Sequence, residues 1–225
     1  MTGIRLVLFD LDGTLADTAP DLAGAVNRML LARGREPLPL SELRPVASHG
    51  ARGLIGRAFG LTPGDAAYEA LRQEFLSEYE SALCEVSTLF PTMAETLASL
   101  EAGGLDWGIV TNKVARFTEP LVRALGLAER AVCVVSGDTT AHAKPHPAPL
   151  VHALRQAGRS APEALYVGDD LRDVQAGQAA GIRTVAAAYG YLGNEVPVEH
   201  WGADAVIASP AELLVLLREQ AVRAT

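Results

Sequence analysis

The chain has 225 residues, with 27 acidic and 19 basic side chains and a net charge of -8. Its 49% hydrophobic and 20% charged residues are typical of a folded globular protein and exclude a disordered or fibrous one. The negative charge and the lack of a run rich in Lys and Arg argue against nucleic acid as a partner. An anionic ligand would have to be bound locally, by a metal ion or by a few placed cations.

The sequence shows no export signal and no membrane span. The first ten residues lead directly into an apolar strand pattern, without the basic region and cleavage site of a signal peptide. The apolar runs are shorter than a bilayer requires. Cys84 and Cys133 have no partners at metal-ligand spacing, which indicates packing and no disulfide framework. We therefore expect a cytoplasmic protein without a membrane partner.

Short apolar runs rich in β-branched residues predict buried strands. In chain order these runs are Leu6–Phe9, 108–110, 132–135, 165–167, 184–187 and Ala205–Ile207. Helical periodicity lies between them, at residues 92–102, 117–125, 147–157 and 174–180. Parallel strands need crossover connections, so this alternation predicts an α/β fold with a doubly wound, mostly parallel sheet.

Residues 16–85 interrupt this alternation, because they contain several helix-like segments and no convincing strand. Residues 21–33 and 66–83 each place apolar side chains on one helical face. The proline-containing stretch 37–45 separates these helices. The sequence thus predicts two domains, a core of residues 1–15 and 86–225 and an inserted helical domain of residues 16–85.

Polar residues directly follow several predicted strands. Ligands of open α/β sheets bind beyond the carboxyl ends of the strands, so these residues are candidates for a functional site. They are Asp10, Asp12 and Gly13 after the first strand, Thr111 and Asn112 after the second, Lys144 at the start of the helix after the third, and Asp169 and Asp173 after the fourth.

Three of these carboxylates, from Asp10, Asp12 and Asp169, could surround a hard divalent cation with oxygen ligands. Mg²⁺ is the cofactor that this set predicts. A metal-held carboxylate can approach a phosphate dianion, so Asp10 could attack phosphorus and form an aspartyl phosphate. Asp12 could then protonate the leaving alcohol and later deprotonate the attacking water.

The remaining candidates suit phosphate binding. Lys144 can offset the excess of negative charge, while Thr111, Asn112 and the backbone amides near Gly13 can donate hydrogen bonds to phosphate oxygens. Asp173 lies four residues after Asp169, so a helix would return it to the same face, either as a partner that supports the metal ligands from behind or as an anchor for Lys144.

Each piece alone has a simpler interpretation. A single Asp at a strand end is usually a helix N-cap, the dipeptide Thr111-Asn112 is most simply a turn, and Lys144 before a proline is a helix start. Their coincidence at one edge of the sheet favours the catalytic interpretation.

The combined pattern resembles the haloacid dehalogenase superfamily, whose phosphatases carry a DxDGT motif, a Thr or Ser, a Lys and a GDxxxD motif. Here these are Asp10 to Thr14, Thr111, Lys144 and Asp169 to Asp173. The resemblance implies a Rossmann-like core, a helical cap in the insertion and phosphatase activity on a small phosphorylated metabolite. It also implies a cap loop at residues 48–52 in which Arg52 contacts substrate, although an exposed surface Arg is the simpler interpretation.

Within the superfamily several alternatives remain. Asp12 argues against carbon-halogen cleavage, since relatives with that activity lack an Asp there. The stretches after the second and fourth strands resemble phosphoglycolate phosphatases, while residues 111–120, 189–191 and 201–204 are similar to bacterial N-acetylmuramic acid 6-phosphate phosphatases. A phosphomutase and a noncatalytic binding protein are the other candidates, and net phosphate release would separate them from a phosphatase.

Overall fold

The computed structural model describes residues 3–193 and 196–223. Its core is a six-stranded sheet with the strand order β5-β4-β1-β6-β7-β8, in which all neighbouring strands are parallel. The strands are β1 Leu6–Phe9, β4 Asp106–Val110, β5 Val134–Val135, β6 Ala164–Gly168, β7 Arg183–Ala187 and β8 Ala205–Ile207. The predicted doubly wound α/β core is therefore confirmed.

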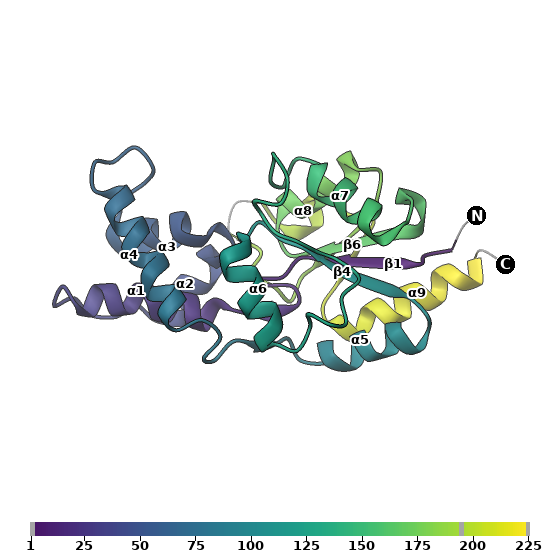
Figure 1. Cartoon of the computed structure of the whole chain (residues 1–225), viewed down its shortest axis with the longest axis horizontal. Coiled ribbons are helices and arrows are strands. Elements are labelled where there is room, and N and C mark those ends of the chain that lie inside the picture. Colours follow the sequence, from purple (N-terminus) through teal and green to yellow (C-terminus); the bar gives the residue numbers. More distant parts are fainter. Residues whose placement is uncertain (1–2, 194–195, 224–225) are drawn as a thin grey trace.

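Helices cover both faces of this sheet. They are α5 Met93–Ala102, α6 Ala115–Ala124, α7 Ala148–Ala157, α8 Leu171–Ala179 and α9 Pro210–Arg223, with short 3-10 helices η2 Ala161–Glu163 and η3 Val198–His200. Alternate side chains of a strand point to opposite faces, so Leu6 and Leu8 pack with α7 and α8, whereas Val7 and Phe9 pack with α5, α6 and α9. Figure 1 shows α7 and α8 on one side of β1, and α5 and α9 on the other.

Some core elements differ from the sequence expectation. The helix predicted at residues 174–180 begins at Leu171, because Asp170 caps it by accepting the Arg172 N–H (2.9 Å). Lys144, expected at a helix start, lies ahead of α7, and α9 has no counterpart among the predicted elements. Throughout residues 3–193 and 196–223, no helix is both long and apolar enough to cross a membrane.

An all-helical cap is inserted after β1, as the sequence predicts. It contains α1 Ala19–Leu31, α2 Leu40–Leu43, the 3-10 helix η1 Arg44–His49, α3 Gly50–Phe59 and α4 Tyr68–Ser81. Val26 and Met29 of α1 share a buried apolar cluster with Leu71 and Phe75 of α4. The cap lies at one end of the sheet, at the left of Figure 1. The apolar faces of its helices form its interior.

A two-stranded antiparallel ribbon connects the cap to the core. It pairs β2 Ala16–Asp17 with β3 Thr88–Leu89, and Asp21 of α1 accepts the backbone N–H (2.8 Å) and hydroxyl (2.5 Å) of Ser87 beside it. The expectation of no strand in this region is wrong, because two-residue strands are too short to show a period. The ribbon lies at the predicted domain bounds 16–85, which stay a prediction.

Two further cap segments differ from expectation. Residues 37–45, predicted as a separator, contain α2, and residues 48–52, predicted as a loop, span the end of η1 and the start of α3. Three glycines lower the helix propensity of α3, so the sequence pattern did not predict a helix here. Burial of Leu54 and Ile55 stabilises the helix in the folded cap.

Candidate active site

A cavity of about 340 Å³ lies between the cap and the carboxyl ends of the strands. Core residues reach it from the ends of β1, β4 and β6 and from the segment before α7, as expected for a parallel sheet. The predicted site residues that line it are Asp10, Asp12, Thr111, Asn112, Lys144 and Asp173. The cap contributes side chains of α1, η1, α3 and α4, so the cavity has walls from both domains.

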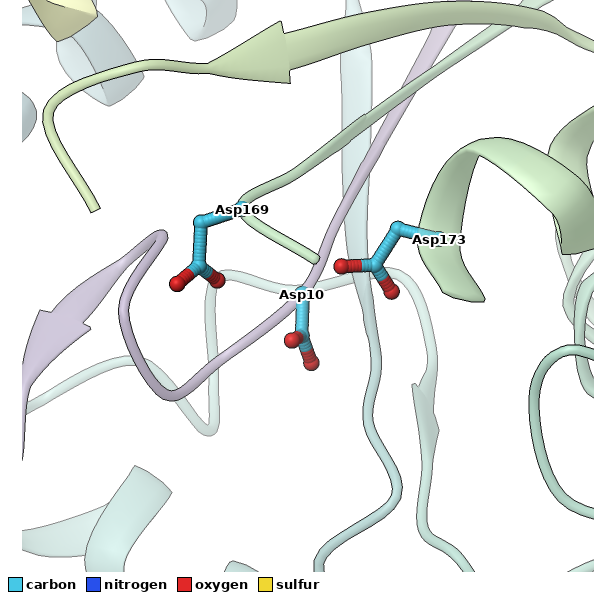
Figure 2. Close-up of side chains that lie close together, drawn as sticks. All are labelled: Asp10, Asp169 and Asp173. Carbon is cyan, nitrogen blue, oxygen red and sulfur yellow. The ribbon is translucent and has the colours of Figure 1, made fainter. Parts of the chain in front are cut away.

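Three carboxylates meet at the core side of this cavity. One oxygen each of Asp10, Asp169 and Asp173 lies within 4.8 Å of the other two, and all three side chains are buried. Figure 2 shows them converging from the end of β1, the end of β6 and the start of α8. Asp12 has no side-chain oxygen in this cluster, so the carboxylates that could hold a metal differ from the predicted set by the exchange of Asp12 for Asp173.

Two glycines allow Asp169 to sit so close to the β1 loop. A Cβ added at Gly13, whose φ is +84°, would collide with the Asp169 carboxylate, and a Cβ at Gly190 would collide with Asp169 and with the Gly13 carbonyl. Gly13 was predicted as a phosphate donor, but its N–H donates to Ala16 O (2.9 Å). Its observed contribution is space for the Asp169 carboxylate.

Lys144 is the cation of the carboxylate cluster. Its Nζ lies 2.9 Å from Asp10 Oδ1 and 2.7 Å from Asp173 Oδ1, and it donates to Tyr166 Oη (2.8 Å) and Val110 O (3.0 Å). The side chain is 3% exposed. Asp173 thus contacts Lys144 and lies in the carboxylate cluster, and its role toward a metal stays a prediction.

The residues after β4 support this arrangement. Asn112 Nδ2 donates to Lys144 O and Asn112 Oδ1 accepts the Lys144 N–H, both at 2.9 Å, so the Asn112 amide holds the Lys144 backbone. Thr111 Oγ1 accepts the Lys113 N–H (3.1 Å) and can still donate its own proton. Phosphate binding by Thr111 and Asn112 stays a prediction.

The cluster carries more negative charge than Lys144 can balance. Burial raises the pKa of Asp10 to about 7, although Lys144 opposes this shift. Burial and the charges of Asp10 and Asp173 raise the pKa of Asp169 well above its usual range. Asp10 Oδ1 is also buried without an aligned hydrogen-bond donor among the described residues, since Lys144 approaches it by distance but not along a hydrogen-bond direction.

These features fit a hard divalent cation. A cation would supply the missing positive charge and a partner for the unsatisfied oxygen, and carboxylates are ligands that Mg²⁺ accepts. Thr14 Oγ1 and the Tyr191 N–H donate to the two oxygens of Asp169 (2.9 and 2.8 Å), which fixes the direction of that carboxylate.

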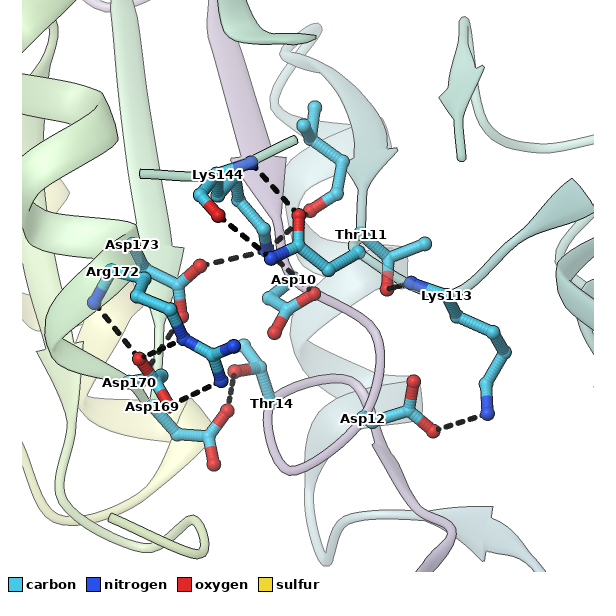
Figure 3. Close-up of polar contacts among 12 residues, drawn as sticks. Asp10, Asp12, Thr14, Thr111, Lys113, Lys144, Asp169, Asp170, Arg172 and Asp173 are labelled. Carbon is cyan, nitrogen blue, oxygen red and sulfur yellow. Dashed lines mark hydrogen bonds and ion pairs between the residues drawn. The ribbon is translucent and has the colours of Figure 1, made fainter. Parts of the chain in front are cut away.

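Asp12 points to a different part of the cavity, beside the cap. Its Oδ1 accepts a hydrogen bond from Thr18 Oγ1 (2.5 Å). The same oxygen lies 3.1 Å from Lys113 Nζ, the contact drawn in Figure 3. Lys113 Nζ in turn donates to Tyr79 Oη of α4 (3.1 Å). The sequence did not assign roles to Lys113 and Thr18, and the only signal was their position next to predicted site residues.

The cap also contacts the core beside α8. Arg172 donates to Ser48 O (2.9 Å) and is paired with Asp170 (2.7 Å), which places Ser48 and His49 at the cavity. Arg52 is exposed on α3 and lies outside the residues that line the cavity. Its predicted substrate contact has no counterpart in this geometry.

Comparison with known proteins identifies the family. A family model described as haloacid dehalogenase-like hydrolase matches residues 7–187. The chain belongs to the haloacid dehalogenase-like hydrolases. The resemblance based on Asp10 to Thr14, Thr111, Lys144 and Asp169 to Asp173 is therefore confirmed.

Among its relatives, this haloacid dehalogenase-like hydrolase is similar to two curated phosphatases. It is 45% identical over 210 residues to an N-acetylmuramic acid 6-phosphate phosphatase of Pseudomonas putida, covering 93% of this chain and 94% of the relative. It is also 45% identical over 210 residues to a phosphoglycolate phosphatase of Xanthomonas campestris, with the same coverage. Both relatives are phosphatases, which confirms the prediction of a phosphoric monoester hydrolase.

A solved structure supports the fold. A crystal structure of a protein described as a predicted phosphoglycolate phosphatase from Haemophilus somnus superimposes with a TM-score of 0.83 at 29% identity, covering 96% of this chain and 99% of that chain. The Rossmann-like core and the helical cap of this haloacid dehalogenase-like hydrolase thus have a close structural counterpart.

Proposed function

We propose that this chain is a Mg²⁺-dependent phosphatase of small phosphorylated metabolites that forms an aspartyl phosphate on Asp10. The observation that carries this proposal is the position of Asp10. Its carboxylate lines the cavity at the end of β1, next to Lys144 and within the cluster formed with Asp169 and Asp173. A nucleophilic carboxylate needs such surroundings, because it must approach an anionic phosphate.

Asp10, Asp169 and Asp173 would hold Mg²⁺, whereas the Asp12 carboxylate, which the sequence also predicts as a ligand, lies outside this cluster. When bound, the ion would neutralise the carboxylates and draw charge from the transferring phosphoryl group. Lys144 would bind a phosphate oxygen, and Thr111 would donate its free hydroxyl proton to another.

The protein residues can complete two half-reactions. Asp10 attacks phosphorus, the bond from phosphorus to the ester oxygen breaks, and Asp12 gives its proton to the leaving alcohol. Asp12 then accepts a proton from water as that water attacks the aspartyl phosphate, which releases phosphate and restores Asp10. The cap residues around the cavity would keep other water away during both steps.

The cavity favours a substrate larger than phosphoglycolate. Its cap side includes the apolar side chains of Leu22, Phe75 and Leu76, and Phe117 lies on the core side. A two-carbon acid would leave most of this wall facing water, whereas a sugar phosphate has carbon surface to cover it. A phosphorylated amino sugar, the substrate class named for the Pseudomonas relative, is our second and more specific candidate.

The test is Mg²⁺-dependent phosphate release from 2-phosphoglycolate, N-acetylmuramic acid 6-phosphate and hexose 6-phosphates. We expect release from at least one of them, and a loss of at least ~1000-fold in Asp10→Asn. Asp106→Asn, which changes an Asp at the opposite end of β4, is the matched control and should keep activity. Release undiminished in Asp10→Asn would refute the aspartyl phosphate, and transfer of the phosphoryl group to another position of the substrate without phosphate release would indicate a mutase.

Metal binding can be tested without turnover. Mg²⁺ at 100 times its dissociation constant should stabilise the wild type by about 2.7 kcal/mol, which thermal unfolding detects as a higher Tm. Asp169→Asn should abolish that increase. A Tm increase of equal size in both proteins would place the ion elsewhere.

A further inference from the structure

The distribution of lysine in this chain is unusual. Lys113 and Lys144 are the only lysines in the sequence, and all other basic side chains are arginines. Both lysines line the cavity, whereas the ion pairs elsewhere in the described structure use Arg. An ammonium is a compact charge on a flexible stem and a guanidinium is a broad planar fork. The cavity, which Arg72 and Arg172 also line, therefore has compact cations at two separate points.

Lys113 contacts the carboxylate proposed as the acid and base. Its Nζ lies 3.1 Å from Asp12 Oδ1, the same oxygen that accepts Thr18 Oγ1 (2.5 Å). The side chains of Lys113 and Asp12 are 9% and 15% exposed, so water screens this pair only partly. Two partners on Oδ1 fix the rotation of the carboxylate and leave Oδ2 as the oxygen that would exchange a proton with a ligand.

The cap holds the same ammonium. Lys113 Nζ donates to Tyr79 Oη (3.1 Å) and lies 4.6 Å from the centre of the Tyr79 ring, within the range of a cation-π interaction. Tyr79 is 2% exposed and packs against Phe75 of α4 and Phe117 of α6. Burial opposes the charge of Lys113, but Asp12 and Tyr79 outweigh it and raise the pKa of the ammonium above its usual range.

We infer that Lys113 is a positioning residue through which the cap controls the proton transfer by Asp12. With Tyr79 in place, Lys113 and Thr18 hold Oδ1 so that Oδ2 faces the scissile ester oxygen. If the cap moves away, Tyr79 leaves and Lys113 loses one of its two anchors, so Asp12 is no longer aligned. The inference rests on the proposed role of Asp12 as the acid. It adds Lys113 as the residue that positions Asp12 and Tyr79 as the contact through which the cap acts.

The experiment compares two probes that differ in their need for an acid. Nitrophenolate leaves p-nitrophenyl phosphate without a proton, whereas the alkoxide of glycerol 2-phosphate needs one. The quantity to measure is kcat/KM, because it reports the steps up to departure of the alcohol. We expect Lys113→Met to lower kcat/KM about 100-fold for glycerol 2-phosphate and less than about 5-fold for p-nitrophenyl phosphate.

Two further variants test the chain of contacts. In an Asp12→Asn background, Lys113→Met should lower kcat/KM for glycerol 2-phosphate by less than about 3-fold, because residues that act as one unit are not additive. Tyr79→Phe keeps the ring and removes the hydroxyl. It should lower kcat/KM for glycerol 2-phosphate roughly 5-fold, the effect of one hydrogen bond, and leave kcat/KM for p-nitrophenyl phosphate unchanged. Arg159→Met, which breaks an ion pair with Asp106 away from the cavity, is the control and should affect neither probe.

Equal losses for both probes would overturn the inference and make Lys113 a phosphate ligand. Full additivity with Asp12→Asn would overturn it as well. If Lys113→Met does not fold, Lys113→Arg and Tyr79→Phe take its place in the test. Both should lower kcat/KM for glycerol 2-phosphate more than for p-nitrophenyl phosphate. Failure of the proposed function looks different, because p-nitrophenyl phosphate would then be hydrolysed by neither the wild type nor any variant, or equally well by Asp10→Asn.

Discussion

The two lysines of the cavity are held in different ways. Within the part of the chain that the structure describes, the polar partners of Lys144 all belong to the core, and two of them, Asp10 and Asp173, come from the end of β1 and from α8. Lys113 lies between Asp12 of the core and Tyr79 of the cap. In the proposed mechanism this difference is a division of labour, in which the core alone would build the place where phosphorus reacts and core and cap together would build the place where the proton moves.

The largest effect should follow from removing the core lysine. Lys144→Met would leave Asp10 and Asp173 buried without their cation, and breaking a buried pair from one side costs about 3–5 kcal/mol. We expect this loss in urea unfolding, together with loss of phosphate release. Lys113→Met should lose less stability, because its pair is more exposed. Equal destabilisation by both variants would contradict the division between core and cap.

The second largest effect should come from a methyl group at Gly190, beside the cluster of Asp10, Asp169 and Asp173. Its Cβ would collide with Asp169 and displace that carboxylate, and overpacking of this kind typically costs about 1–3 kcal/mol. We expect Gly190→Ala to lower phosphate release about 100-fold and to abolish the Tm increase with Mg²⁺. Gly3→Ala, where nothing lies within 4 Å of an added Cβ, is the matched control. Unchanged Mg²⁺ binding in Gly190→Ala would show that Asp169 is not a ligand.

The attachment of the cap can be weakened without touching the cavity. Asp21 is 5% exposed and accepts the backbone N–H of Val86 (3.2 Å) and Ser87 (2.8 Å). Asp21→Ala leaves these donors unpaired, which should lower the free energy of unfolding by about 1–3 kcal/mol. The ratio of kcat/KM for the two phosphate probes should stay that of the wild type. A changed ratio would mean that the ribbon also sets the position of Asp12.

The smallest effect is expected at the rim, where Arg116 of α6 pairs with Glu80 of the cap. Both side chains are about half exposed, so water screens the pair and it should contribute little to stability. Arg116→Ala should shift the urea midpoint only slightly, and the shift should vanish at high salt. A large, salt-independent loss of stability in Arg116→Ala would show that this pair holds the cap on the core more strongly than an exposed ion pair usually does.

The sequence predicts the core side of the site well. Asp10, Thr111 and Asp169 follow buried strands, and the topology of a parallel sheet brings strand ends to one edge whatever the details of packing. Lys144 does not follow from this argument, because it was expected at a helix start and lies in the segment between β5 and α7.

The cap side could not be predicted in this way. The contact between Lys113 and Tyr79 depends on how α4 sits over the sheet, and helical periodicity gives only which face of α4 is apolar. The direction of the Asp12 side chain depends on Thr18 and Lys113 in the folded protein. The position of Arg52 could not be predicted for a similar reason. It lies on α3, and the three glycines of α3 weaken the sequence signal for a helix there.

The ribbon of β2 and β3 has a consequence for how such enzymes diversify. The chain leaves the core and returns to it through two neighbouring strands, so the whole cap is attached at one narrow point. A different cap with the same two ends could be exchanged there without rebuilding the sheet. Chimaeras that carry the cap of a relative on this core would then inherit the chemistry of one parent and the substrate preference of the other.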